Sequence, residues 1–121
     1  MKKSVKKIEK YFSTLCQELP HICPHEEDDW EWRDEGMELM GSGDLPGAEK
    51  KFKELILAEP QHHDGYEGLA LVYQKLGRRE EALLLIDHAV TLAEGFLEEG
   101  TLDPEVLEEI KEERRQILKM D

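Results

Sequence analysis

The sequence predicts an all-α protein made of antiparallel helix pairs, with an additional helix at each end. Three observations support this prediction. Apolar residues recur at helical spacing near both ends of the chain, and the central part contains two copies of one pattern. Charged residues make up 37% of the 121 residues and hydrophobic residues 39%, which suits thin helices around a small core. A chain of this length is expected to form a single domain.

The first predicted element is an amphipathic helix over residues 5 to 19. Its apolar residues are separated by three or four positions, the spacing that places them on one face of a helix. They are Val5, Ile8, Phe12, Leu15 and Leu19. The helix is expected to end near Pro20, because proline disfavours helical geometry in the residue before it. The segment from Met1 to Pro20 contains five lysines and two glutamates, whereas the whole chain has a net charge of −13, so a basic helix precedes a strongly acidic body.

The central part contains two predicted helix pairs, over residues 29 to 41 and 46 to 58, and over residues 64 to 76 and 79 to 94. When the sequence is aligned with itself at one constant offset, large residues of the first helix pair align with large residues of the second, and small residues align with small ones. The matching pairs are Trp32 and Tyr66, Leu39 and Tyr73, Gly43 and Gly77, Ala48 and Ala82, Phe52 and Ile86, and Leu55 and Ala89. Local signals agree with these boundaries, since Asp44 before Pro46 marks a helix start, Asp64 with Glu67 fits a capping box, and Gly77 suits a helix end.

The last predicted element is a helix that begins at Asp103 and Pro104. Its apolar stripe consists of Val106, Leu107, Ile110, Ile117 and Leu118. The charged residues between positions 108 and 115 are expected to face outward, as they would on a helix that caps a stack. The predicted organisation therefore begins with an N-terminal helix and an acidic connector over residues 1 to 28. Two repeat units follow over residues 29 to 62 and 63 to 100, and the capping helix lies in residues 101 to 121.

The two repeat units resemble the tetratricopeptide repeat (TPR) family. The residues that carry the resemblance are Trp32, Gly36, Ala48, Phe52 and Pro60 in the first unit, and Tyr66, Leu69, Ala70, Tyr73, Ala82 and Ala89 in the second. The chain departs from the family pattern at Glu35, where leucine is usual, and at Glu94, which replaces a closing proline and suggests that the helix continues to Glu99. The resemblance implies a short right-handed superhelix whose first helices line a groove.

The resemblance also implies which residues line that groove. They are Trp30, Arg33, Met37 and Met40 from the first unit, and Asp64, Glu67, Leu71, Gln74 and Lys75 from the second. Methionines are adaptable apolar contacts, and the flanks are acidic. We therefore expect an interaction adaptor that binds a helix or peptide with apolar and basic residues and has no catalytic activity. The positions that hold an acidic C-terminus in carboxylate-clamp TPR domains are Arg33, Met37 and Gly68 here, so such a tail is not the expected ligand.

An alternative interpretation is a self-assembling structural module. The basic helix over residues 5 to 19 would lie in its own groove, against the first unit, or in the groove of a neighbouring chain, which would give a homodimer. A structural zinc ion would hold this helix in place if it were bound by the thiolates and imidazoles of Cys16, His21, Cys23 and His25. Their spacing matches no established zinc motif, and Cys16 equally suits burial beside the apolar stripe, with the other three as ordinary linker residues. His62 and His63 are expected in an exposed turn between the units.

Other classes of function are disfavoured by the sequence. The net charge of −13 would repel the phosphate backbone of nucleic acids and gives a membrane-binding helix little support. There is no long apolar run and no apolar stretch typical of a secretory signal, so we expect a cytoplasmic protein. The glycine-rich residues 41 to 47 follow a helix rather than a strand and lack the lysine of a phosphate-binding loop. No enzyme signature and no cofactor other than the alternative zinc is predicted.

Overall fold

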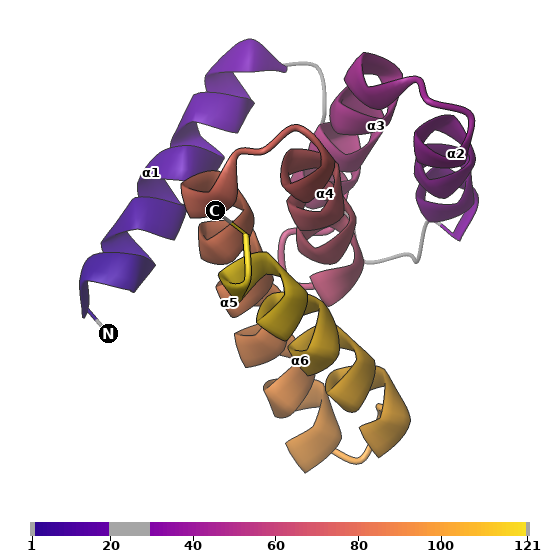
Figure 1. Cartoon of the computed structure of the whole chain (residues 1–121). Coiled ribbons are helices and arrows are strands. Elements are labelled where there is room, and N and C mark those ends of the chain that lie inside the picture. Colours follow the sequence, from indigo (N-terminus) through magenta and orange to yellow (C-terminus); the bar gives the residue numbers. More distant parts are fainter. Residues whose placement is uncertain (1, 20–29, 121) are drawn as a thin grey trace.

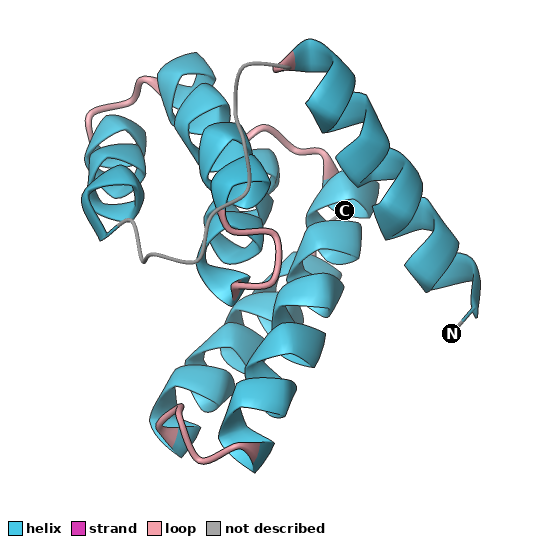
Figure 2. Ribbon diagram, turned by 180° about the vertical axis from the view of Figure 1, so that it is seen from behind, coloured by secondary structure: helices cyan, strands magenta, loops and turns pink. Residues whose placement is uncertain are grey.

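A computed structural model describes residues 2 to 19 and 30 to 120, with side chains from residues 7 to 19 and 31 to 120. The described part of the chain contains α-helices and no strands, so the all-α prediction is confirmed (Figure 2). The helices are α1 (Lys2–Glu18), α2 (Trp30–Gly41), α3 (Leu45–Ala58), α4 (His63–Lys75), α5 (Arg79–Glu98) and α6 (Pro104–Leu118). Helix α5 continues to Glu98, in line with the expected continuation past residue 94.

The helix pairs α2–α3 and α4–α5 have the same turn geometry. The turns contain Gly43 and Gly77, with φ angles of 91° and 76°, a conformation that glycine adopts without steric cost. The hydrogen bonds that close the turns also occupy matching positions of the two units: Asp44 N–H donates to Leu39 O and Arg78 N–H to Tyr73 O, both at 2.9 Å. The sequence repeat therefore coincides with a repeat of turn geometry.

Close packing of α2, α3 and α4 depends on the Phe52 side chain, which is fully buried. Its ring lies against two glycines, Gly36 on α2 and Gly68 on α4. A Cβ atom at Gly36 would lie 2.7 Å from the ring, and one at Gly68 would lie 2.2 Å from it. The three helices therefore approach one another closely because these two positions have no side chain.

Helix α1 lies on the opposite side of the molecule from α2, with α3 and α4 between them (Figure 1). It contacts α3 and α5, and it buries Ile8 and Leu15 there. The Tyr11 hydroxyl is 3.1 Å from that of Tyr73 on α4. The sequence left two positions open for this helix within its own chain, in the groove or against the first repeat unit. The structure shows it packed against α3 of the first unit and also against α5 of the second.

Helix α6 runs antiparallel to α5 and covers it (Figure 1). Its buried residues Leu107, Ile110 and Ile117 come from the predicted stripe. Beside them, the Arg114 guanidinium donates to the Asp87 carboxylate of α5. Among the described helices, none is both long and apolar enough to cross a membrane.

Candidate functional site between helices α2 and α4

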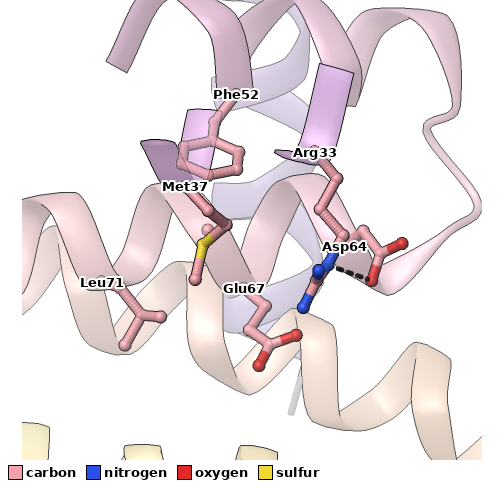
Figure 3. A pocket seen from close by; sticks show the side chains of 7 residues that line it. Arg33, Met37, Phe52, Asp64, Glu67 and Leu71 are labelled. Atoms are coloured by element: carbon pink, nitrogen blue, oxygen red, sulfur yellow. Dashed lines mark ion pairs between the residues drawn. The ribbon is translucent and has the colours of Figure 1, made fainter. Parts of the chain in front are cut away.

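A small pocket lies where α2, α3 and α4 meet (Figure 3). Its lining residues come from all three helices: Arg33, Met37, Phe52, Asp64, Glu67, Gly68 and Leu71. The cavity volume is about 10 Å³, which is close to the space that one water molecule needs. Pockets that bind organic small molecules are at least about thirty times larger. The cavity itself therefore suits a water molecule or an ion rather than a metabolite, and a larger group would lie over its opening.

Five of the nine groove residues predicted from the sequence line this pocket: Arg33, Met37, Asp64, Glu67 and Leu71. The other predicted residues are not among its lining residues. Met40 packs against the core, Gln74 is partly buried and Lys75 is exposed. Trp30 is the first residue of α2, but its side chain is outside the described part of the structure.

The charges around the pocket are mostly negative. Arg33 Nε lies 3.5 Å from Asp64 Oδ1, and Arg33 Nη1 lies 3.8 Å from Asp34 Oδ1. Arg33 is the one cationic residue among those that line the pocket, and it faces the carboxyl groups of Asp64 and Glu67. A cation added here would compete with Arg33 for the Asp64 carboxylate.

Glu67 is buried beside a second carboxyl group, Glu113 of α6. Burial raises the pKa of Glu67 to about 9, and the hydrogen bond and negative charge of Glu113 contribute to this rise, against a smaller opposing effect of Arg33. Burial also raises the pKa of Glu113. Glu67 therefore keeps a proton at neutral pH, because two adjacent buried carboxylates disfavour full ionisation of both.

Two histidines precede these carboxyl groups at the start of α4. The Asp64 backbone N–H donates to His62 Nδ1 at 3.2 Å, so His62 is the N-cap of the helix. The predicted capping box of Asp64 and Glu67 is therefore wrong. The prediction of an exposed His63 is also wrong, since its side chain is only 6% exposed and burial lowers its pKa.

The contribution of Glu113 is the part of this site that sequence analysis missed. The charged residues of α6 were expected to face outward, but Glu113 is partly buried and its Oε1 makes no hydrogen bond to any described residue. A signal for His63 was present, because His63 and Glu67 are four residues apart and share a helix face. No comparable signal marks Glu113, whose neighbours depend on how α6 docks.

The predicted zinc residues are only partly described. Cys16 is a free, exposed cysteine on α1, so the alternative in which it is buried beside the apolar stripe is wrong. His21, Cys23 and His25 lie outside the residues that the structure describes.

Comparison with known proteins finds no match among family models, among curated proteins or among solved structures.

Proposed function

We propose that this protein is a TPR-type adaptor that binds a segment of a partner protein in the groove between α2 and α4. The observation that supports the proposal is the convergence on one pocket of five side chains that the family resemblance implies for the groove. The repeated turns at Gly43 and Gly77 support a common arrangement of the two helix pairs.

The position of α1 leaves this groove accessible. Helix α1 contacts α3 and α5, the second helix of each pair, whereas the pocket is lined mainly by α2 and α4, the first helices. The described residues of the basic helix therefore do not cover the pocket, and its opening is left for a segment of another protein to lie across.

The lining residues indicate the chemistry of the partner. Met37 and Leu71 offer partly buried apolar surface, and methionine adapts its shape to different ligands. Asp64 lies beside this surface and favours a lysine or arginine of the ligand, and Glu67 does so when an approaching cation displaces its proton. The proposed partner segment is therefore amphipathic, with an apolar anchor and basic flanks.

The test uses two synthetic helical peptides and the full-length protein. One peptide carries an apolar stripe flanked by lysines, and the matched control carries glutamates in place of the lysines. Fluorescence anisotropy is expected to show saturable binding of the lysine peptide and none of the glutamate peptide. The variant Met37→Glu with Leu71→Glu should weaken binding at least about tenfold, because it removes the apolar anchor site.

The control variant is Leu118→Glu, which introduces a charge at an exposed apolar residue of α6. It should bind the lysine peptide as the wild type does. Circular dichroism should show the same helical content in all variants. Equal binding by the Met37→Glu, Leu71→Glu variant, or equal binding of the two peptides, would contradict the proposed groove.

A further inference from the structure

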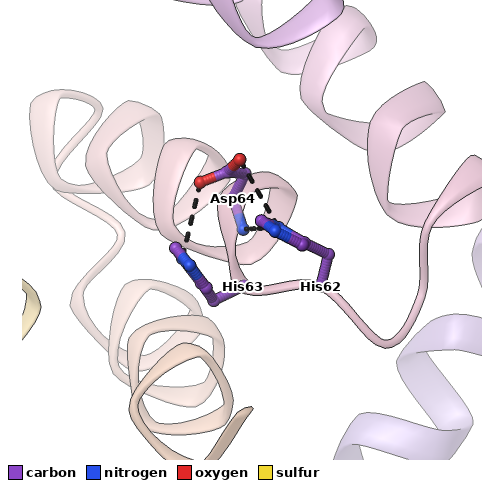
Figure 4. Close-up of side chains that lie close together, drawn as sticks. All are labelled: His62, His63 and Asp64. Atoms are coloured by element: carbon purple, nitrogen blue, oxygen red, sulfur yellow. Dashed lines mark hydrogen bonds and ion pairs between the residues drawn. The ribbon is translucent and has the colours of Figure 1, made fainter. Parts of the chain in front are cut away.

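Three consecutive residues at the start of α4 place metal-ligating atoms close together (Figure 4). His62, His63 and Asp64 each offer a nitrogen or oxygen atom, and these atoms lie within 4.8 Å of one another. His62 Nδ1 is 3.4 Å from Asp64 Oδ2, and His63 Nδ1 is 3.4 Å from Asp64 Oδ1. Each oxygen of one carboxylate therefore faces a different imidazole.

His63 supplies a second, independent indication of a ligand. Its side chain is more than nine-tenths buried, and its Nδ1 makes no hydrogen bond to any residue that the structure describes. Carboxylate oxygens lie near this atom, with Asp64 Oδ1 at 3.4 Å and Glu67 Oε1 at 3.9 Å. A buried polar atom without a hydrogen bond is costly, so a group that binds it would stabilise the protein.

The spacing of these atoms is close to that of the ligands around a tetrahedral metal ion. Zinc binds imidazole nitrogens and carboxylate oxygens at about 2.0 to 2.2 Å, which places neighbouring tetrahedral ligands roughly 3.3 to 3.5 Å apart. Each imidazole nitrogen lies 3.4 Å from the nearer oxygen of the Asp64 carboxylate. Because these are two different oxygens, a rotation of the carboxylate would bring one of them within reach of a metal held by both nitrogens. Two imidazoles and a carboxylate also form a ligand set that zinc and related transition metals prefer over calcium or magnesium.

The surrounding side chains hold the two imidazoles in place. The rings of His62 and His63 stack with centroids 4.5 Å apart. Phe96 of α5 lies against both, at 5.5 Å from His62 and 6.1 Å from His63. A ligand set that is oriented in advance by packing loses less entropy when the metal binds.

We propose that His62, His63 and Asp64 form a binding site for a divalent transition metal ion of the zinc class, and that the ion replaces Arg33 as the cation beside the Asp64 carboxylate. Glu67 Oε1, 3.9 Å from His63 Nδ1, would join as a further ligand on losing its proton. Binding exchanges the cap hydrogen bond from Asp64 N–H to His62 Nδ1 for a metal bond. Because Arg33 and Asp64 also line the pocket between α2 and α4, metal binding would change the charge of that pocket.

The test is a zinc titration of full-length protein that has first been treated with a chelator and dialysed. Calorimetry is expected to show one zinc ion bound per chain at this site. In His62→Asn with His63→Gln, zinc affinity should fall about 100-fold or more, since removing even outer contacts of a metal site costs 10- to 100-fold. Asparagine at position 62 retains a side chain that caps helices well, so α4 should keep its start.

Two further variants distinguish this site from the cysteine-containing one and test the role of Arg33. Cys16→Ser with Cys23→Ser should leave the zinc affinity of this site unchanged, because it alters only the other predicted zinc residues. Arg33→Gln should bind zinc several-fold more tightly, since it removes the competing cation from Asp64. With Co²⁺ as a probe, the protein should show the ligand-field absorption of a tetrahedral nitrogen and oxygen site and no charge-transfer band from cysteine.

Three results would overturn the proposal. They are the absence of saturable zinc binding by the wild type, unchanged binding by the histidine variant, and loss of binding in the cysteine variant. If circular dichroism shows that the histidine variant is unfolded, Asp64→Asn decides the question, because it removes the carboxylate charge while keeping the shape of the side chain. Unchanged zinc affinity in a folded Asp64→Asn protein would then exclude the site. The zinc result is independent of peptide binding, so either proposal can fail without the other.

Discussion

At the scale of single residues, two glycines determine how closely α2 and α4 approach the Phe52 ring. Gly36 and Gly68 both lack the side chain that would overlap with this ring. Because Phe52 is fully buried among three helices, it has little freedom to move aside. The pocket between α2 and α4 therefore depends on residues that have no side chain themselves.

A first prediction follows for Gly68→Ala. The added Cβ would lie 2.2 Å from the ring, so we expect the free energy of unfolding to fall by about 1 to 3 kcal/mol, as in other overpacked cores. The matched control is Gly95→Ala in α5, where a Cβ atom has nothing within 4 Å. This change should stabilise the protein by about 0.5 to 1 kcal/mol, because alanine is the better helix former.

Urea unfolding followed by circular dichroism would measure both effects. The double variant Gly68→Ala with Phe52→Leu should recover part of the lost stability if the ring is the cause, since leucine occupies less space at the point of overlap. Equal effects of alanine at positions 68 and 95 would contradict this explanation of the close approach.

A second prediction concerns His88 on α5, which packs edge-on against the Tyr66 ring at 4.6 Å between centroids. Burial lowers the pKa of His88, so the unfolded chain binds a proton there more readily than the folded one. The contribution of neutral His88 to stability is therefore complete above the ordinary histidine pKa of about 6.5 and is lost as the pH falls toward the lowered value.

The measurement is the difference between the free energies of unfolding at pH 7.5 and pH 5.5 for the wild type and His88→Gln. The variant should lose less stability on acidification, because glutamine does not titrate. His63 and the carboxyl groups titrate in both proteins, so their effect cancels in the comparison. An equal loss in both proteins would show that His88 does not contribute to the acid sensitivity.

At the scale of helices, sequence patterns predicted the elements well because each pattern is local. The stripe of α1, the internal repeat and Pro104 at the start of α6 are all read from short stretches of chain, and the corresponding helices are present. The prediction failed at the start of α4, where His62 takes the capping role that Asp64 was expected to have. Histidine is an uncommon cap, so helix-capping preferences favour the aspartate.

The failures within the candidate site have a different origin. The burial of His63 depends on Phe96, which is distant in sequence and lies on α5, and the partial burial of Glu113 depends on how α6 docks. Contacts between elements distant in sequence leave no periodic signal, and charged residues such as Glu113 are exposed in most proteins. Five of the predicted groove residues line one pocket because the family resemblance selects equivalent positions of α2 and α4.

At the scale of the whole molecule, the position of α1 determines the expected assembly state. The helix packs on α3 and α5, and Leu15 there is 1% exposed. A single chain therefore covers the buried side chains of this helix without help from a second copy. The net charge of −13 also opposes self-association, because two copies repel each other at low ionic strength.

The last prediction is that the protein is a monomer with a mass of 14.1 kDa in native mass spectrometry at micromolar concentration. Leu15→Ala should expose α1 amides to hydrogen exchange and leave those of α4 protected, since the lost packing is confined to the contact of α1 with α3 and α5. Cys16→Ala, at an exposed position of the same helix, is the control and should leave exchange unchanged. The opposite result would be a dimer mass for the wild type and a monomer mass for Leu15→Ala. It would mean that α1 makes these contacts on a neighbouring chain, as the self-assembly interpretation requires.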